Sequence, residues 1–353
     1  MVVVHTKRTP SRKRVGRQTK GLSAVSIQIQ NLLVVVVVGS IVCAYFVIQR
    51  HEERVREQYP KTVSRSASQI LSKGKPFLVY GTAWKEERTA DLVAEAIRQG
   101  FRFIDTANQP KHYNEAGVGD GWTRAANELH LDRSDLFLQT KYSPNQDKDP
   151  PYDPQASLPD QVITSVQSSL KHLRTNYIDS LVLHSPLRTM QDTLTVWKAM
   201  EQFVEDGTVK HLGISNCYDL ETFQTLYESA RIKPIVLQNR FYEKSNFDTE
   251  LRKFVKRNNV SYQSFWTLTA NRQALSKSSE IMEMANAKGL TPQTLMFAFL
   301  MSLGYITPLS GTTNIKHMQQ DVDVMERIQA GEIFFETEQE LRVMAKAIGM
   351  PDL

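Results

Sequence analysis

Four polar side chains in this 353-residue chain have the chemistry of a proton-transfer site. Asp105, Lys141 and His184 stand at or near the ends of short apolar runs rich in β-branched and aromatic residues, which are typical of strands. Tyr113 follows the first of these runs. A phenol can protonate a carbonyl oxygen, an ammonium beside it lowers its pKa, a carboxylate holds the ammonium, and an imidazole orients the oxygen or relays the proton. The set therefore suits the reduction of a carbonyl group.

The spacing of these residues favours one common site over separate structural roles. Taken singly, Asp105 could cap a helix, Lys141 could lie on the surface and His184 could be a core histidine. However, 36 positions separate Asp105 from Lys141, and 43 separate Lys141 from His184. Each interval is about one strand–helix–strand unit of a barrel. Because the carboxyl ends of parallel barrel strands meet on one face, we expect these side chains to lie together.

Eight apolar runs alternate with helical patterns from residue 77 onward. Between Val162 and Leu173, for example, apolar residues recur at i+4 and i+3 spacing, and Pro159 and Pro292 stand where the first turn of a helix tolerates proline. This alternation predicts an α/β fold, a (β/α)8 TIM barrel. A doubly wound open sheet is the alternative, but no G-x-G-x-x-G motif follows the first run. The predicted strands are residues 77–81, 101–105, 135–141, 180–184, 209–215, 234–238, 260–265 and 305–309.

The positive charge of the chain is concentrated at its N-terminus. Residues 1–60 carry ten Lys or Arg and three Glu, whereas the whole chain has a net charge of +5, so the remaining residues have a net charge of −2. A nearly neutral body gives no indication of a nucleic-acid surface. The only cysteines, Cys43 and Cys217, exclude a disulfide framework. The eight histidines lack the H-x-x-x-H spacing of a zinc site, and we predict no metal.

An apolar segment follows a basic N-terminal tail. Residues 32–48 contain no charged side chain, and Val25, Ile27 and Ile29 extend the run, which is enough for one transmembrane helix of about 17–25 residues. Its basic flank is expected on the cytoplasmic side, so the body would lie across an endomembrane. A mitochondrial presequence, a cleaved signal peptide and a buried core helix are the alternatives. The predicted organisation is a tail at 1–24, a transmembrane signal anchor at 25–49, a linker at 50–75 and the barrel at 76–353.

Five segments of the chain resemble the aldo-keto reductase family, in the family's order. The resemblance covers about residues 76–320. It implies a (β/α)8 fold, NADPH as the usual hydride donor, and reduction of an aldehyde or ketone to an alcohol. It also implies that Tyr113 is the acid, supported by Lys141 and Asp105, with His184 beside the carbonyl. The segments are Phe103-Ile104-Asp105-Thr106-Ala107, Gln139-Thr140-Lys141, Leu183-His184-Ser185-Pro186, Gly213-Ile214-Ser215-Asn216 and Gln238-Asn239.

The loop that carries the tyrosine departs from the family pattern. The family has one residue between the tyrosine and Asn-Glu, whereas here Tyr113 directly precedes Asn114-Glu115. A strict alignment therefore puts His112 at the position of the tyrosine. We predict Tyr113 as the acid, because the longer loop changes the register and a histidine does not replace phenol chemistry. Tyr142 is the other substitute.

The resemblance assigns residues around the nicotinamide and the substrate. Ser215, Asn216 and Gln238 match residues that hold the nicotinamide amide, which needs both donors and acceptors. At the end of the seventh strand, Phe265 matches the aromatic residue that stacks on the nicotinamide ring, and Trp266 would stack as well. Trp84 matches the aromatic wall of the substrate pocket.

The segment after the last strand is expected to bind phosphate. The hydroxyls of Ser310 and Thr312, together with backbone N–H groups at a helix start, suit an anion. By the resemblance, Leu309 replaces a lysine, and Lys316 takes the place of the arginine that binds the 2′-phosphate, so NADPH is preferred over NADH. The C-terminal tail, residues 334–353, is expected to form a helix that closes on the body and, by the resemblance, contacts substrate.

The leading hypothesis is therefore a membrane-anchored, NADPH-dependent reductase of a small carbonyl substrate. A catalytically weak NADPH-binding regulatory or interaction protein on the same barrel is the alternative, because the tyrosine loop is altered. A barrel hydrolase using Asp105 and His184 ranks lower, because no nucleophile elbow is present. The Pro- and Asp-rich insertion at residues 143–158 could form a substrate wall or only cover the barrel rim. The sequence predicts neither the substrate nor the oligomeric state.

Overall fold

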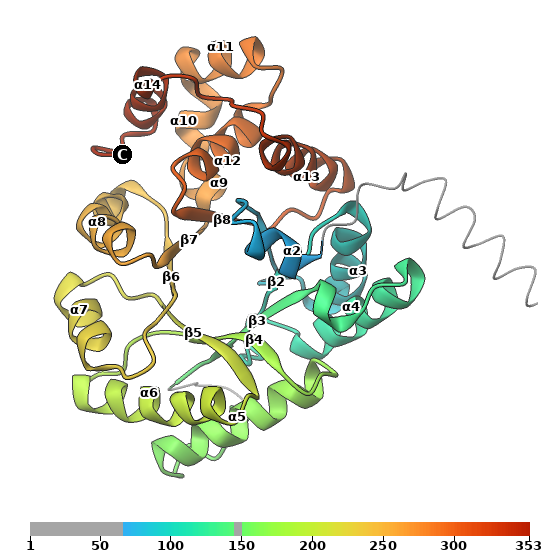
Figure 1. The fold of residues 1–353 in the computed structure, drawn as a ribbon, viewed down its shortest axis with the longest axis vertical. Helices are drawn as coiled ribbons and strands as arrows, with labels where there is room; N and C mark the ends of the chain where they lie inside the picture. Colours follow the sequence, from blue (N-terminus) through green and yellow to red (C-terminus); the bar gives the residue numbers. More distant parts are fainter. Residues whose placement is uncertain (1–65, 145–149) are drawn as a thin grey trace, which may run out of the picture. The chain divides into compact units, whose positions relative to one another are not determined.

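The computed structural model describes residues 66–144 and 150–353, which form a closed barrel of eight parallel strands (Figure 1). The strands pair in chain order, and β1 closes the ring on β8. The predicted (β/α)8 barrel is confirmed, and each strand bound lies within two residues of its prediction. The strands are β1 Val79–Gly81, β2 Phe103–Asp105, β3 Phe137–Tyr142, β4 Ile178–Leu183, β5 Val209–Ser215, β6 Val236–Arg240, β7 Ser261–Phe265 and β8 Ile306–Ser310.

Helices surround the strands and cover the outside of the barrel (Figure 1). Their starts follow the predicted signals: Pro159 and Pro292 lie in first turns, and the Thr291 side chain caps the second of these helices by accepting from the Thr294 N–H. The helices are α2 Ala67–Ser72, α3 Thr89–Gln99, α4 Glu115–Leu129, α5 Leu158–His172, α6 Met190–Glu205, α7 Leu220–Ser229, α8 Thr249–Arg257, α9 Thr267–Ala270, α10 Arg272–Lys277, α11 Ser279–Ala287, α12 Pro292–Ser302, α13 Ile315–Ala330 and α14 Glu338–Ile348, with short 3-10 turns at Glu86–Arg88, Arg133–Asp135 and Glu243–Asp248.

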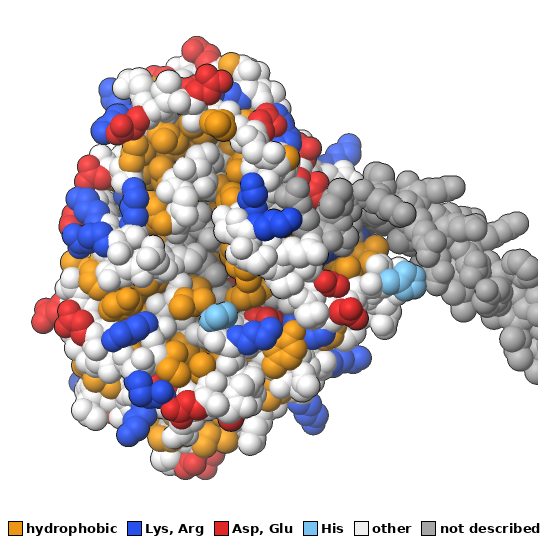
Figure 2. Space-filling model, viewed as in Figure 1, with side chains coloured by type: hydrophobic (Ala, Val, Ile, Leu, Met, Phe, Trp, Pro, Cys, Tyr) orange, Lys and Arg blue, Asp and Glu red, His pale blue; other side chains and the backbone are white. Residues whose placement is uncertain are grey.

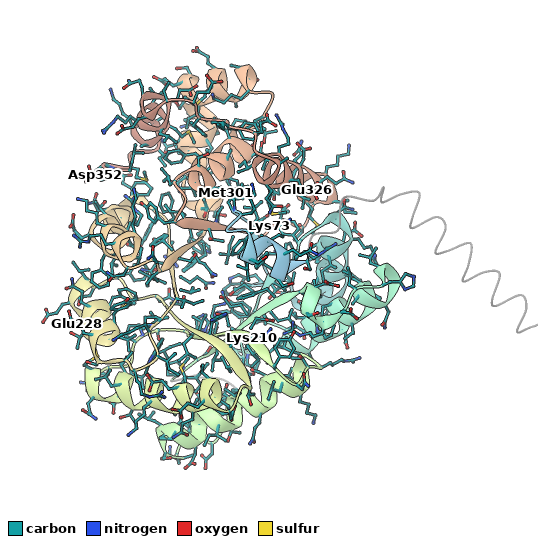
Figure 3. All side chains as sticks on the ribbon, viewed as in Figure 1. Lys73, Lys210, Glu228, Met301, Glu326 and Asp352 are labelled. Carbon is teal, nitrogen blue, oxygen red and sulfur yellow. The ribbon has the colours of Figure 1, made fainter. Side chains whose placement is uncertain are left out.

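The core lies inside the ring of strands and between the strands and the helices. Every residue of β4 is buried, as expected for a parallel strand that is covered on both faces. Helix α12 is apolar along most of its length and is buried as well. Figure 3 shows Met301 of α12 within the molecule, whereas Glu228 lies on the outer helix α7 and Asp352 lies in the C-terminal segment after α14. On the face shown in Figure 2, acidic and basic side chains are interspersed among apolar ones.

Helix α2 corrects part of the predicted linker at residues 50–75. Ala67 and Ile70 of this short helix are buried and form a cluster with Val79 and Phe103. These two strand residues stand at the amino ends of β1 and β2, so α2 covers the end of the barrel opposite the strand carboxyl ends. The prediction failed because a polar, Ser-rich segment with only two inward-facing apolar residues resembles a linker in composition.

Other predictions for the chain ends have different outcomes. The tail at 1–24 and the predicted transmembrane anchor at 25–49 lie outside the described residues, and no helix within the described part of the chain is long and apolar enough to span a membrane. At the other end, the predicted C-terminal helix is present as α14. Its Met344, Ala345 and Ile348 are buried against the body.

Candidate active site

A cavity of about 1010 Å³ opens at the carboxyl ends of the strands. This is the end of a (β/α)8 barrel at which active sites form, because side chains from successive strands converge there. All of the predicted site residues line the cavity except Lys141, which lies buried beside it. The lining includes Trp84, Asp105, Tyr113, His184, Ser215, Asn216, Gln238, Phe265, Trp266, Ser310, Thr312 and Lys316.

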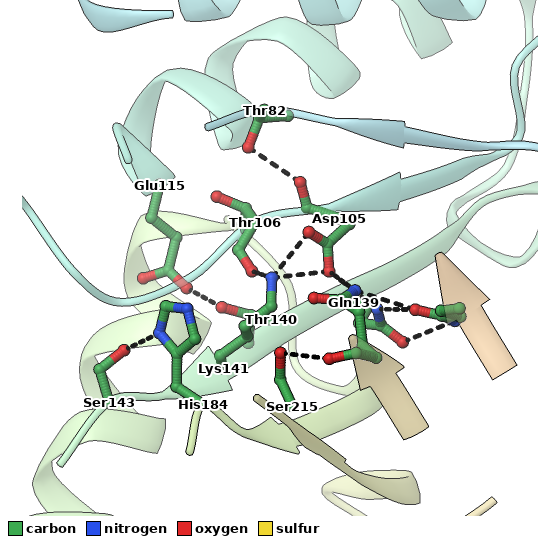
Figure 4. A network of polar contacts seen from close by, with 12 residues as sticks. Thr82, Asp105, Thr106, Glu115, Gln139, Thr140, Lys141, Ser143, His184 and Ser215 are labelled. Carbon is green, nitrogen blue, oxygen red and sulfur yellow. Dashed lines mark hydrogen bonds and ion pairs between the residues drawn. The ribbon is translucent and has the colours of Figure 1, made fainter. Parts of the chain in front are cut away.

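Asp105 and Lys141 form a buried ion pair at the ends of β2 and β3 (Figure 4). The Lys141 Nζ donates to both carboxylate oxygens of Asp105, at 2.7 and 2.8 Å, and to the carbonyl of Thr106 at 2.8 Å. Burial lowers the pKa of Lys141, and the Asp105 carboxylate opposes this shift. The three N–H groups of the ammonium are all engaged by these acceptors.

Two glutamines hold the Asp105 carboxylate from inside the barrel and a third links them, an arrangement that the sequence analysis did not foresee. Gln139 and Gln238 each donate to Asp105 Oδ1, at 2.8 and 3.0 Å. Both also donate to Gln263 Oε1, at 2.7 and 2.9 Å, which links β3, β6 and β7 in one polar layer. The strand register places Gln139 beside Asp105 and Gln263 beside Gln238. Gln238 therefore also supports Asp105, in addition to the cofactor contact predicted for it.

The loop after β2 directs Tyr113 inward and His112 toward the cavity mouth. The Tyr113 ring lies 5.1 Å from Lys141 Nζ and 5.9 Å from the His184 ring. The His112 ring instead packs on Trp84, with ring centres 4.1 Å apart, and its Nδ1 is 2.8 Å from Gln109 Oε1. Of the two neighbouring residues, only Tyr113 lies beside both the Asp105–Lys141 ion pair and His184.

The expected lowering of the Tyr113 pKa by Lys141 is not found. Burial and the negative charge of Asp105 raise the pKa of Tyr113 above its usual value. The physical reason lies in the ammonium: its N–H groups donate to Asp105 and Thr106, and it forms no hydrogen bond with the tyrosine hydroxyl. Tyr113 is thus a neutral phenol across the physiological pH range, and its hydroxyl has no hydrogen-bond partner among the described residues.

His184 follows β4 and is held by Ser143, another residue that the sequence analysis did not single out. The Ser143 Oγ lies 2.5 Å from His184 Nδ1 (Figure 4). Burial, with the nearby charges of Lys141 and His112, lowers the pKa of His184 to about 3. The imidazole is therefore neutral at physiological pH, and Nε2 has no partner in the part of the chain that the structure describes.

The residues predicted to hold the nicotinamide amide lie side by side at the ends of β5 and β6. Ser215 donates to the Gln238 carbonyl at 2.7 Å, and Asn216 Nδ2 donates to the His184 carbonyl at 2.9 Å. Asn216 has a φ of 51°, a left-handed conformation that Asn adopts more readily than most residues. These contacts tie the β5 and β6 ends to the His184 strand end.

Phe265 and Trp266 both reach the cavity, and an unpredicted arginine stacks on the second. The Arg240 guanidinium lies 4.0 Å from the Trp266 ring centre and 5.9 Å from that of Phe265. Trp266 is 49% exposed, whereas Phe265 is more enclosed. Arg240 lies two positions after Gln238, so inspecting the residues just beyond each predicted strand would have found it.

The predicted phosphate segment gathers at the ends of β8 and β1. Ser310, Thr312 and Lys316 all line the cavity. Two residues that the sequence analysis missed lie with them: Lys85, whose Nζ donates to the Gly311 carbonyl, and Asp321 of α13, whose Oδ2 accepts from Ser310 at 2.7 Å. Burial raises the pKa of Asp321 to about 7.

The insertion after β3 and the C-terminal tail contribute unequally to the cavity. Ser143 and Pro144 line it, whereas Tyr152 is buried and donates to the Ser143 carbonyl at 2.7 Å. Among the described residues that line the cavity, none follows Asp321. The expected contact of the tail with the substrate pocket is therefore wrong for α14, which packs on α10 and α11 instead. No cluster of metal-ligating side chains occurs in the described ranges.

Solved structures share this fold. A metagenomic aldo-keto reductase from the Medee basin superposes with a TM-score of 0.64 and 22% identity, covering 79% of this chain and 93% of that one. An aldo-keto reductase of the silkworm Bombyx mori also gives 0.64, at 19% identity, covering 78% and 84%. At these identities the similarity establishes the fold alone.

Sequence comparison establishes the family. An uncharacterized oxidoreductase of Schizosaccharomyces pombe is 28% identical over 66% of this chain and 76% of its own length. An NAD(P)H-dependent D-xylose reductase of Kluyveromyces lactis is 28% identical over 64% and 78%. The model of the aldo/keto reductase family matches residues 77–333. The match spans the whole barrel and every described element of the cavity, and on this evidence the chain belongs to the aldo/keto reductase family.

Proposed function

We propose that this protein reduces an aldehyde or ketone to an alcohol, with NADPH as hydride donor and Tyr113 as general acid. The observation that carries the proposal is the convergence of a neutral phenol, a buried Lys–Asp pair and a neutral imidazole at one cavity. A phenol and an imidazole on the same side of a cavity can both reach one carbonyl oxygen.

The cavity fits a dinucleotide in size and in chemistry. Its volume of about 1010 Å³ lies at the upper end of ordinary ligand sites. Ser215, Asn216 and Gln238 offer amide and hydroxyl groups for the nicotinamide amide, and Phe265 offers an aromatic face. The hydroxyls of Ser310 and Thr312 and the amine of Lys316 suit phosphates. When bound, NADPH supplies the hydride that the protein itself lacks.

The side chains of the protein supply the proton and the orientation. The Tyr113 hydroxyl gives its proton to the carbonyl oxygen as negative charge develops there, and solvent restores that proton afterwards. The His184 Nε2 orients the same oxygen. Lys141, held by Asp105, lies 5.1 Å from the centre of the Tyr113 ring and supports the ring that carries the proton-donating hydroxyl. Because the phenol pKa is raised, the acid stays protonated into the alkaline range.

The names of two relatives suggest which carbonyl compounds to test first with NADPH and NADH. Methylglyoxal reductase of Salmonella typhimurium and xylose reductase of Kluyveromyces lactis are similar to this chain, so methylglyoxal and D-xylose head a panel of carbonyl compounds. We expect loss of NADPH absorbance with at least one member of the panel, and slower loss with NADH because Lys316 favours a 2′-phosphate. No turnover with any carbonyl compound, by a protein that is folded by circular dichroism, would contradict the proposal.

A regulatory NADPH-binding protein is the second candidate function. The observation in its favour is that the Lys141 ammonium donates its hydrogen bonds to Asp105 and Thr106 and none to the Tyr113 hydroxyl. Calorimetric titration with NADPH separates the two candidates when combined with the turnover assay. Tight binding without turnover supports the regulatory protein, and binding with turnover supports the reductase.

We also propose that residues 25–49 anchor the reductase in an endomembrane as a single-pass segment. The support is the uncharged run at residues 32–48, preceded by seven Lys or Arg and no acidic residue. The full chain should remain with the membrane pellet after washing with carbonate at high pH, whereas a variant with two aspartates in the valine run should be released. Release of the unaltered chain by carbonate would contradict the anchor.

A further inference from the structure

Arg240 ends β6 at the cavity and is oriented by aromatic rings. Its guanidinium lies 4.0 Å from the centre of the Trp266 ring and 5.3 Å from that of Tyr242. Its partner in the strand register is Phe265, whose ring centre is 5.9 Å away. Stacking occupies the faces of a guanidinium and leaves the N–H groups at its edge for other acceptors.

Those N–H groups lack acceptors. Within residues 66–144 and 150–353, the Arg240 side chain forms no ion pair and donates no hydrogen bond, and its buried Nε has no partner. Asp248 accepts from Asn239 and Tyr262 through Oδ2 and forms no ion pair with Arg240 within the described residues, although its buried Oδ1 has no partner there. A buried N–H donor on a charged group normally has a hydrogen-bond acceptor. A buried N–H without an acceptor at a ligand cavity therefore indicates that the ligand supplies the acceptor.

The other charges at the cavity point to an anionic partner. Two described carboxylates line it: Asp105 is paired with Lys141, and Asp321 accepts from Ser310. Lys85 and Lys316 line the same cavity as Arg240. The basic side chains that line the cavity are therefore not balanced by its two carboxylates.

We propose that Arg240 binds an oxyanion of the molecule held in this cavity. A guanidinium with a free edge binds a carboxylate or a phosphate through two parallel N–H groups. The inference deepens the proposed function and rests on it for the two sources of the oxyanion: the carboxylate of an anionic carbonyl substrate, or the pyrophosphate of the dinucleotide. Because Arg240 lies two positions beyond Gln238, it stands on the same side of β6, one step farther toward the cavity mouth.

The test compares Arg240→Met with Arg342→Met in the full chain. Methionine keeps an unbranched apolar stem against Trp266 and removes the N–H groups. Arg342 is a matched control, because it is an exposed arginine of α14 that bonds only to Glu338 in the described chain. The probes are NADPH, inorganic pyrophosphate and succinate, titrated by calorimetry. Turnover is compared between succinic semialdehyde and butanal, which have the same chain length and differ in the carboxylate.

Arg240→Met should lower at least tenfold either the kcat/KM ratio of succinic semialdehyde over butanal or the affinity for NADPH. Arg342→Met should change neither of these. If the substrate supplies the oxyanion, the ratio of kcat/KM for succinic semialdehyde over butanal falls and succinate binding weakens, with NADPH affinity unchanged. If the cofactor supplies it, the affinities for NADPH and pyrophosphate fall and that ratio is unchanged. Arg240→Lys should recover part of the loss, since it keeps the charge without the fork.

Equal anion binding and an equal substrate ratio, within twofold, in Arg240→Met and the unaltered chain would overturn the inference. So would a chain that binds none of the three probes. An unaltered chain that binds pyrophosphate or succinate through Arg240, but turns over no carbonyl compound, would leave the anion site standing and contradict only the proposed reductase.

Discussion

At the scale of single residues, the site depends on side chains that position other side chains. Asp105 is held by Gln139 and Gln238, and it in turn fixes Lys141. His184 is fixed in the same way by Ser143. Both arrangements place a charge or a donor in one orientation before a ligand arrives, which is what proton transfer at a defined atom requires.

Ser143 is expected to set the tautomer of His184. A hydroxyl that donates to Nδ1 leaves the imidazole proton on Nε2, where it can meet a carbonyl oxygen. Ser143→Ala should lower kcat/KM about tenfold and shift the imidazole ¹⁵N resonances toward a mixture of tautomers. Ser180→Ala is the control, because the buried Ser180 hydroxyl has no described partner. Unchanged ¹⁵N resonances in Ser143→Ala would refute the assignment.

Asp321 should make stability depend on pH. Its pKa is raised from 3.8 in the unfolded chain to about 7 by burial, so the folded protein binds the extra proton. Stability from this group is therefore fully present below about pH 4 and is lost as pH rises through 7. Asp321→Asn should raise the free energy of unfolding by roughly 1–3 kcal/mol at pH 8 and change it little at pH 4. Urea unfolding at the two pH values measures this, and an equal effect at both would contradict it.

At the scale of elements, α2 closes the barrel end that lies opposite the active site. Ile70 is 3% exposed and packs with Val79 and Phe103, whereas the neighbouring Leu71 is 43% exposed. Ile70→Ala should therefore cost about 2–4 kcal/mol of unfolding free energy, and Leu71→Ala less than about 0.5. Thermal or urea unfolding checks the difference. Similar losses in the two variants would mean that α2 does not hold the barrel end closed.

Strands and helices were more predictable than the loops between them. Runs such as Leu181-Val182-Leu183 are apolar because β4 is buried on both faces, and the capping signal at Thr291-Pro292 is local. Helix α2 carries only two buried apolar residues, so no periodic pattern distinguishes it from a linker. The loop that carries His112 and Tyr113 is held by tertiary contacts, such as the bond from the Trp84 N–H to the His112 carbonyl at 2.8 Å, and these contacts direct the two side chains to different places.

At the scale of the whole molecule, the barrel explains why residues spread over more than 200 positions meet. The carboxyl ends of the strands converge, so an ionisable residue at the end of a predicted strand is a strong indicator of the site. That rule located Asp105, Lys141 and His184. It does not give hydrogen-bond partners, and for this reason the expected effect of Lys141 on the Tyr113 pKa was wrong, and the roles of Arg240 and Ser143 were not foreseen.

The most direct test of the account compares Tyr113→Phe with His112→Phe in NADPH-dependent reduction of an aldehyde that the unaltered protein turns over. We expect Tyr113→Phe to lower kcat on the order of 100-fold or more with unchanged NADPH affinity, because the proton donor is removed. His112→Phe should stay within about fivefold, since His112 packs on Trp84 away from the Lys141 pair. The reverse order, with His112→Phe inactive and Tyr113→Phe active, would contradict the assignment of the acid.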